Sequence, residues 1–255
     1  MANFASYLNS AANPPSTVST SYGGEESYFS GSYMDRVCND FMKAGSRGIS
    51  VFFSAGDYGV GGNGEKSCPN GYIPVWPALC PWSTAVGGTQ FESDGSETVA
   101  QYTRINGSGG GGFSNHFPTP DYQSADVAAY VKADSASDKQ NYNTKGRGYP
   151  DISLVSQNFQ VVVNGQTLSV LGTSASSPSW AALVSVLNDY RKSQGKSNLG
   201  FINPLLYSAK GKSGLRDVTQ GNNPGCGKKG YSATAGWDPA SGLGSLDFAK
   251  FRAAL

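Results

Sequence analysis

The sequence predicts an α/β fold in which helices flank a parallel sheet. Strand-forming residues at 17–22 and an apolar run at 49–53 enclose a helix-forming segment, and a strand, a helix and a strand in that order form a parallel crossover unit. A further buried strand is predicted at 152–155. Apolar residues at i, i+3, i+4 and i+7 from Trp180 to Leu187 predict a long amphipathic helix behind it.

Taken in order, the chain begins with a helical segment at 3–9, which Asn13-Pro14-Pro15 ends. Apolar residues from Met34 through Met42 to Gly45 mark the helix of the crossover unit. The other predicted elements are a long loop at 61–82, a strand at 84–86, a helix at 121–133, a polar surface loop at 135–148, strands at 159–163 and 167–171 joined as a hairpin by Asn164-Gly165, a short helix from Asn203, a loop at 211–235 and a helix at 247–254.

Composition limits the classes of partner. The chain has 255 residues with 38% hydrophobic content, which suits one domain, and 19 basic against 18 acidic residues leave a net charge of +1. We therefore expect no nucleic-acid partner and no anionic membrane partner, and we expect a monomer. No apolar run is long enough to span a membrane, and residues 1–25 show no secretion signal.

Four cysteines without a CxxC pair favour disulfides over zinc and leave three pairings open. A sequon at Asn106-Gly107-Ser108 lies in a glycine-rich loop where a glycan could attach, which adds weak support for a secreted protein. The glycine run at 106–112 also resembles a phosphate-binding loop, but no GK[ST] follows it.

Ser174 is a candidate nucleophile because it lies at the start of the long amphipathic helix. Free backbone N–H groups and the positive end of the helix dipole would stabilise an oxyanion formed there. Pro178 is predicted to lie in the first helical turn, where its missing N–H costs nothing. The simpler interpretation is an ordinary serine N-cap, and only distant residues can decide between the two.

Asp57 is a second candidate because it follows the predicted strand at 49–53, and ligand sites in parallel sheets lie at the carboxyl ends of strands. The alternative is an aspartate turn before Gly59. Glu25 and Glu26 point to different sides of any regular element, so we interpret them as structural or peripheral. The single histidine, His116, lies in a Gly/Pro-rich loop and is a poor candidate for the base of a Ser-His-Asp triad.

An ordered series of motifs resembles the sedolisins, the acid serine-carboxyl peptidases that include the tripeptidyl peptidases. The matching segments are SYGGEE at 21–26, SAGDYG at 54–59, VGGT at 86–89, GGGFSNHFP at 110–118, YPDIS at 149–153, GTSASSP at 172–178, DVTQG at 217–221 and GWDPASGLG at 236–244. The resemblance covers residues 3–255 as one peptidase domain and corresponds to the C-terminal two-thirds of the family's catalytic domain. It implies a subtilisin-like fold and hydrolysis of peptides or proteins at acidic pH, either as a tripeptidyl peptidase or as an endopeptidase.

The resemblance also implies roles for residues. Ser174 matches the family's nucleophile, and Asp57 matches the carboxyl group that helps to bind the oxyanion. The family's glutamate–aspartate base pair lies before the strand at 17–22, but residues 1–16 contain no Glu and no Asp. We therefore expect an N-terminally truncated domain whose base lies upstream of this chain, and we expect the chain alone to be inactive. The alternative is a non-catalytic, calcium-stabilised extracellular binding module with the same fold.

One calcium ion is implied as well, bound by the carboxylates of Asp217 and Asp238 and the main-chain oxygens of Val218, Thr234 and Gly236. Carboxylates and carbonyls are the ligands that calcium prefers, although two aspartates at turns are the commoner meaning of such a pattern. The resemblance further implies disulfides Cys38–Cys80 and Cys68–Cys226, and a secreted protein or, alternatively, a lysosomal or vacuolar one.

Overall fold

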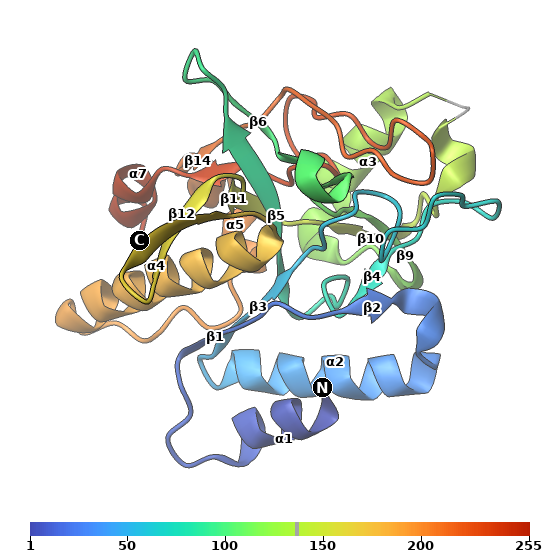
Figure 1. The fold of residues 1–255 in the computed structure, drawn as a ribbon. Helices are drawn as coiled ribbons and strands as arrows, with labels where there is room; N and C mark the ends of the chain where they lie inside the picture. The colour runs from blue at the N-terminus through green and yellow to red at the C-terminus, as the bar shows by residue number, and fades with distance from the viewer. Residues whose placement is uncertain (136–137) are drawn as a thin grey trace.

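A parallel sheet in the order β1-β3-β5-β11 forms the centre of the molecule (Figure 1). Its strands are β1 (Thr17–Thr20), β3 (Ser50–Ser54), β5 (Thr84–Phe91) and β11 (Ile152–Val155), and all three neighbouring pairs are parallel. The short strand β6 (Glu97–Val99) pairs antiparallel with the end of β5. The predicted α/β class and the parallel crossover unit are confirmed.

Helices cover both faces of this sheet. Helix α4 (Thr173–Ser193) packs against all four parallel strands, while α2 (Gly31–Ser46) packs on the opposite face with α1 (Ala2–Ser10) outside it (Figure 1). The buried side of α2 follows helical spacing through Val37, Cys38 and Phe41. None of the described helices is both long and apolar enough to cross a membrane.

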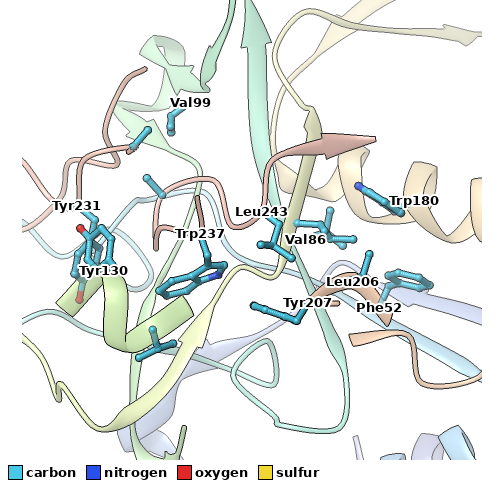
Figure 2. Close-up of a cluster of buried hydrophobic side chains, with 14 of the residues drawn as sticks. Phe52, Val86, Val99, Tyr130, Trp180, Leu206, Tyr207, Tyr231, Trp237 and Leu243 are labelled. Atoms are coloured by element: carbon cyan, nitrogen blue, oxygen red, sulfur yellow. The ribbon is translucent and has the colours of Figure 1, made fainter. Parts of the chain in front are cut away.

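Strand β3 separates two hydrophobic cores because successive side chains of a strand point to opposite faces. Val51 and Phe53 belong to the core under α2, and Phe52 belongs to the core under α4. Figure 2 shows the second core, with Phe52 and Trp180 at one end and the aromatic ring of Tyr130 at the other. The apolar run at 49–53 is thus explained by burial on both sides of the sheet.

The structure, a computed structural model, describes residues 1–135 and 138–255. Residues 136–137 of the predicted surface loop at 135–148 therefore lie outside the described residues. The prediction is wrong for the end of that loop, which forms β10 (Gly146–Tyr149). The strand forms because this segment pairs with β9 (Gly112–Pro118), and its Arg147 is buried in an ion pair with Asp151 at 2.6 Å, neither of which a polar sequence reveals.

The helix predicted from Met34 to Gly45 is α2, on which Met42 is 40% exposed. Two further predictions need correction. The long loop at 61–82 contains β4, whose pairing with β2 joins distant segments. The loop at 211–235 begins with the end of α6 and with β14, which pairs with β15.

The shorter elements are β2 (Gly24–Glu25), η1 (Glu26–Tyr28), β4 (Val75–Trp76), β7 (Gln101–Tyr102), η2 (Thr103–Ile105), β8 (Gly107–Ser108), β9 (Gly112–Pro118), η3 (Asp121–Gln123), α3 (Ser124–Ala133), η4 (Asp138–Asn141), β12 (Phe159–Val163), β13 (Gln166–Val170), α5 (Asn203–Leu206), α6 (Ala209–Lys212), β14 (Leu215–Arg216), β15 (Ser245–Leu246) and α7 (Phe248–Ala253).

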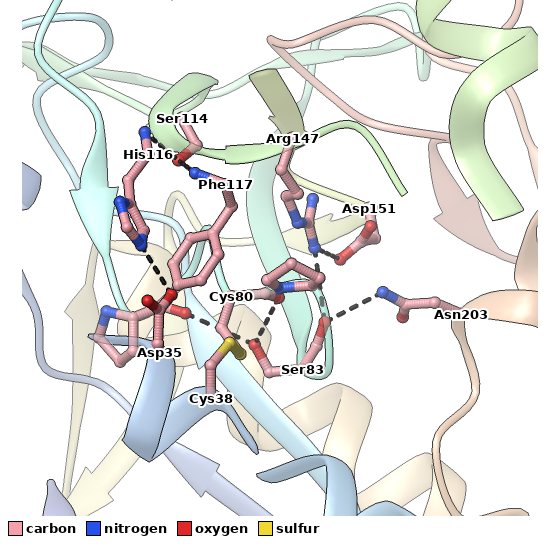
Figure 3. The surroundings of a disulfide bond; sticks show 12 residues. Asp35, Cys38, Cys80, Ser83, Ser114, His116, Phe117, Arg147, Asp151 and Asn203 are labelled. Carbon is pink, nitrogen blue, oxygen red and sulfur yellow. Dashed lines mark hydrogen bonds and ion pairs between the residues drawn. A yellow bond between two sulfur atoms is a disulfide. The ribbon is translucent and has the colours of Figure 1, made fainter. Parts of the chain in front are cut away.

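Both implied disulfides are present. Cys38 of α2 is bonded to Cys80, and Figure 3 shows this bond beside Ser83. Cys68 is bonded to Cys226, which joins two long loops that lie 158 residues apart in the sequence. In the chain-entropy model, a cross-link over a loop of that length stabilises the fold by about 3–5 kcal/mol.

Candidate active site

Ser174 is exposed at the N-terminal end of α4, as the sequence predicts. The helix begins at Thr173, and Gly172 before it has φ 121°, a conformation that favours glycine. A Cβ atom at Gly172 would also come within 2.9 Å of Asp57 Oδ2. In the described part of the chain, the Ser174 hydroxyl has no hydrogen-bond partner, so it is free for another group.

Pro178 does not lie in the first turn of α4, contrary to the prediction, because the helix starts at Thr173 and Pro178 falls in its second turn. Proline has no N–H, so the carbonyl of Ser174 loses its usual intrahelical donor. The Ser21 hydroxyl donates to that carbonyl instead, at 3.3 Å. Because Pro178 leaves the Ser174 carbonyl without an intrahelical donor, the start of α4 can hydrogen-bond to the segment that follows β1.

Asp57 lies just beyond β3 and contacts the residue next to Ser174. Its Oδ1 accepts hydrogen bonds from the Thr173 backbone N–H at 2.7 Å and from the Thr173 hydroxyl at 2.9 Å. The Thr173 hydroxyl also lies 3.1 Å from the Gly56 carbonyl oxygen. Two residues that are 117 positions apart in sequence thus meet at one helix end, and the structure brings the candidates Ser174 and Asp57 together.

A glycine loop closes one side of this region. Gly110 donates its N–H to the Gly56 carbonyl at 2.8 Å, and a Cβ atom at Gly110 would collide with the Ala55 carbonyl oxygen. Only glycine permits such a close approach of two backbones. The glycine run at 106–112 therefore serves close packing beside Asp57.

His116 lies against α2, where its Nε2 is 2.7 Å from Asp35 Oδ1 (Figure 3). Glu26 is structural: its carboxylate accepts from the Ser114 hydroxyl and from the backbone N–H groups of Asn115 and His116. Within residues 1–135 and 138–255, no carboxylate or imidazole is hydrogen-bonded to the Ser174 hydroxyl. The contacts of Ser21 and Thr173 are not predictable from the sequence, because both depend on where distant segments meet.

The five residues implied in calcium binding also lie together. Asp217 Oδ2 accepts from the Gly236 N–H at 2.8 Å, and Asp238 Oδ2 accepts from the Thr234 N–H at 2.9 Å. The Ser241 hydroxyl lies 3.1 Å from both the Val218 carbonyl oxygen and Asp238 Oδ1. Ser241 is a member of this cluster that sequence reasoning missed.

The donor set of this cluster fits a hard cation. Burial raises the pKa of Asp238 to about 7, and burial also raises the pKa of Asp217. Neither carboxylate is ion-paired among the described residues, and no described residue donates to the carbonyls of Thr234 or Gly236. In the same part of the chain, no three His, Cys, Asp or Glu side chains are placed to hold a metal. A bound cation would therefore depend on two carboxylates and on main-chain oxygens.

The sheet order, the helices on both faces and the long helix that starts beside Asp57 define a subtilisin-like α/β protein. Among solved structures, Pseudomonas sedolisin, a serine-carboxyl proteinase complexed with two molecules of pseudo-iodotyrostatin, superposes with a TM-score of 0.74 at 28% identity, covering 98% of this chain and 68% of that one. Sphericase superposes with a TM-score of 0.51 at 20% identity over 90% of this chain and 56% of its own, which is a likeness of fold alone.

Sequence relatives give the same result. Aorsin of Aspergillus oryzae is 38% identical over 271 residues, or 93% of this chain and 40% of aorsin. Tripeptidyl-peptidase SED4 of Arthroderma otae is 40% identical over 255 residues, or 92% of this chain and 41% of that relative. No protein-family model matches the chain. The chain belongs to the sedolisin family of serine-carboxyl peptidases, and it spans about 40% of the length of these relatives.

Proposed function

We propose that this chain supplies the nucleophile and the oxyanion-binding group of a serine-type peptidase that acts at acidic pH. The observation that carries the proposal is the 2.7 Å hydrogen bond from the Thr173 N–H to Asp57 Oδ1, because it fixes a carboxyl group beside the exposed Ser174. Asp57 Oδ2 accepts no hydrogen bond from the described residues, so it is available to carry a proton toward substrate.

In the proposed reaction, Ser174 Oγ attacks the carbonyl carbon of the scissile peptide bond while its proton passes to a general base. The carbonyl oxygen becomes an oxyanion, which a protonated Asp57 and the N–H groups at the start of α4 stabilise. The C–N bond then breaks, the amine leaves with a proton, and water hydrolyses the acyl-enzyme. Asp57 can donate only when protonated, so the reaction requires acid.

The general base is assigned by family resemblance to a glutamate–aspartate pair in a segment outside these 255 residues. The absence of a base hydrogen-bonded to Ser174 among the described residues supports this assignment. Carboxylates with ordinary pKa values near 4 act as bases only in acid. Acidic pH is also what Asp57 requires, because it can donate a hydrogen bond only when protonated. The substrate is a peptide or protein, cleaved either by release of a tripeptide or within the chain.

A calcium ion would be held by Asp217, Asp238 and the carbonyl oxygens of Val218, Thr234 and Gly236. The ion would supply positive charge that offsets the burial of the Asp238 carboxylate. Bound there, it would connect the segment after β14 to the turn at 234–241.

We further propose that the protein is extracellular, with a lysosome or vacuole as the alternative, and that it is a monomer. Two disulfides and no free cysteine in the described residues support an oxidising compartment.

The competing function is a non-catalytic binding module with the same fold, which the unpartnered hydroxyl of Ser174 would also suit. Labelling by a fluorophosphonate separates the two functions. We expect a covalent adduct on Ser174 when residues 1–255 are supplied with a segment that carries the glutamate–aspartate pair; this preparation is called the complemented chain below. An adduct elsewhere, or none, would support the binding module.

A further inference from the structure

The one N-x-S/T sequon of the chain, Asn106-Gly107-Ser108, lies where η2 ends and β8 begins. In such a sequence the asparagine is the acceptor for an N-linked glycan, and the hydroxyl residue two positions later is part of what the transferase recognises. Sequons also arise by chance. Whether this one can carry a glycan depends on the surroundings of Asn106 and Ser108 in the fold.

The Asn106 side chain is exposed and holds nothing in place. Its amide makes no hydrogen bond with any described residue, and its backbone has φ 54°, a left-handed conformation that asparagine tolerates better than most residues. The turn is held by the main chain, where the Asn106 N–H donates to the Thr103 carbonyl at 3.3 Å. A sugar on the Asn106 amide would therefore break no contact of the fold.

There is room for a sugar beside this side chain. Asn106 lines a surface cavity of about 610 Å³, together with Tyr58, Lys66, Ile105 and Pro224. A cavity of this size is within the range that holds small molecules, roughly 300–1,000 Å³. The first sugar of a glycan can thus lie against the protein without displacing any segment.

Ser108 is in the opposite state, because its side chain is fully buried. Its hydroxyl donates to the carbonyl of Pro224 at 3.3 Å, across 116 positions of sequence. Its backbone N–H donates to the Asp57 carbonyl at 3.0 Å, and a Cβ atom at Gly59 would come within 2.6 Å of Ser108 Oγ. In the folded domain a transferase can reach Asn106 but cannot reach the hydroxyl of the same sequon.

We propose that Asn106 carries an N-linked glycan, which is added before the segment at Pro224 packs on Ser108. In the transfer, Asn106 Nδ2 bonds to the anomeric carbon of a lipid-linked oligosaccharide diphosphate. The bond from that carbon to the diphosphate oxygen breaks, the lipid diphosphate leaves, and Nδ2 gives one proton to a base of the transferase. The proposal rests on the extracellular location proposed above and is independent of the chemistry at Ser174.

The first experiment asks whether residue 106 is modified. The complemented chain, made with a supplied segment free of sequons, is expressed behind a secretion signal in a eukaryotic host and collected from the medium. We expect peptide-N-glycosidase F to increase its gel mobility, and we expect Asn106→Gln to abolish this shift. Digestion in heavy-oxygen water should label residue 106, which distinguishes glycan release from spontaneous deamidation of the Asn-Gly pair.

The turn Asn164-Gly165-Gln166 is a matched control. Asn164 is also exposed, with φ 52°, but the exposed Gln166 supplies no hydroxyl. Asn164 should be unmodified in the parent protein, and Gln166→Ser should create a site that is modified. Ser108→Thr keeps the hydroxyl and should retain the glycan at residue 106. Asn106→Gln should melt within about 1 °C of the unglycosylated parent protein, because exposed side chains contribute little to stability.

The second experiment tests the timing. Protein from a bacterial host, which adds no such glycan, is offered to the transferase and its lipid-linked donor either folded with both disulfides or reduced and denatured. We expect the folded protein to accept a glycan at Asn106 at least about tenfold more slowly, because reaching Ser108 requires local opening. Folded Gln166→Ser should accept a glycan at Asn164 faster than at Asn106, since its new hydroxyl is not buried.

An unmodified Asn106 in the secreted parent protein would overturn the proposal, and glycosylation of Gln166→Ser in the same host would show that the transferase was active. Equal rates for the folded and denatured proteins would overturn the timing. Neither result touches the proposed function, which fails instead if the complemented chain forms no fluorophosphonate adduct on Ser174.

Discussion

The two regions that hold the candidate functional residues are built in different ways. Ser174 and Asp57 stand at the ends of regular elements, α4 and β3, and they are joined by hydrogen bonds of 2.7 and 2.9 Å through Thr173. Asp217 and Asp238 stand in irregular backbone, where turns supply the N–H groups that satisfy them. The geometry of the first region follows from the fold alone. The second region holds two carboxylates, one of them the buried Asp238, and no described side chain forms an ion pair with either.

This difference teaches that the two regions should respond to different changes. A substitution at the first should reduce turnover and leave stability alone, since Ser174 is exposed and its hydroxyl holds nothing in place. Removal of a cation from the second should reduce stability first.

The largest expected effect is on turnover. Ser174→Ala in the complemented chain should lower kcat by about 10⁴- to 10⁶-fold, as loss of a nucleophile does in other serine peptidases. The melting temperature should stay within about 1 °C, because surface substitutions change stability little. Steady-state kinetics with a tripeptide-releasing substrate and a thermal scan measure both. A large drop in melting temperature would contradict the proposed difference between the two regions, because it would show that Ser174 stabilises the fold.

A smaller loss of turnover is expected when Asp57 is replaced. Asp57→Ala should lower kcat by about 10²- to 10³-fold, the usual cost of losing one oxyanion-hole donor. Asp57→Asn retains an N–H donor that needs no acid, so it should lose less and should keep more of its activity as pH rises. Asp35→Asn, which alters the exposed contact of His116, is the control and should act like the parent protein. Equal pH profiles for Asp57→Asn and the parent would contradict the proposed role.

Chelation should act on the other region. Calcium at a hundredfold excess over its Kd stabilises by about 3 kcal/mol, so excess EDTA should lower the melting temperature by roughly 5–10 °C. Asp217→Asn should remove this response, whereas Asp94→Asn, at an exposed turn, should keep it. No change on chelation, together with no calcium in elemental analysis, would count against the site.

The smallest effect is expected at the contact between the two segments of the catalytic region. Ser21→Ala removes a 3.3 Å hydrogen bond to the Ser174 carbonyl, worth about 0.5–1.5 kcal/mol. We expect a two- to tenfold loss in kcat/KM with little change in melting temperature. Ser10→Ala, on the outer helix α1, should change neither quantity. Loss of stability rather than activity would show that Ser21 supports the fold.

Local patterns were sufficient where burial repeats along one element. The face of α4 through Trp180, Val184 and Leu187 is buried as its spacing predicts, and the alternation in β3 follows from a strand covered on both faces. Patterns failed where two distant segments meet. Arg147 looks like a surface residue in sequence, and its burial depends on the Ser83 carbonyl, 64 positions away, as well as on Asp151.

The same limit applies to the candidate site. Ser174 at a helix start and Asp57 after a strand are each visible in sequence, and sheet topology predicts that such ends converge. The position of Pro178 was misjudged because the start of α4 is set by Gly172 and Asp57, not by the proline.

The central proposal is that residues 1–255 supply the nucleophile and the oxyanion-binding group, while another segment supplies the general base. The most direct test compares peptide hydrolysis by residues 1–255 alone and by the complemented chain near pH 4. We predict no release of tripeptides above background by residues 1–255 and restored release by the complemented chain, which Ser174→Ala then abolishes. Turnover at an ordinary enzymatic rate by residues 1–255 alone would contradict the assignment of the base to another segment. It would return His116, now paired with Asp35, to consideration.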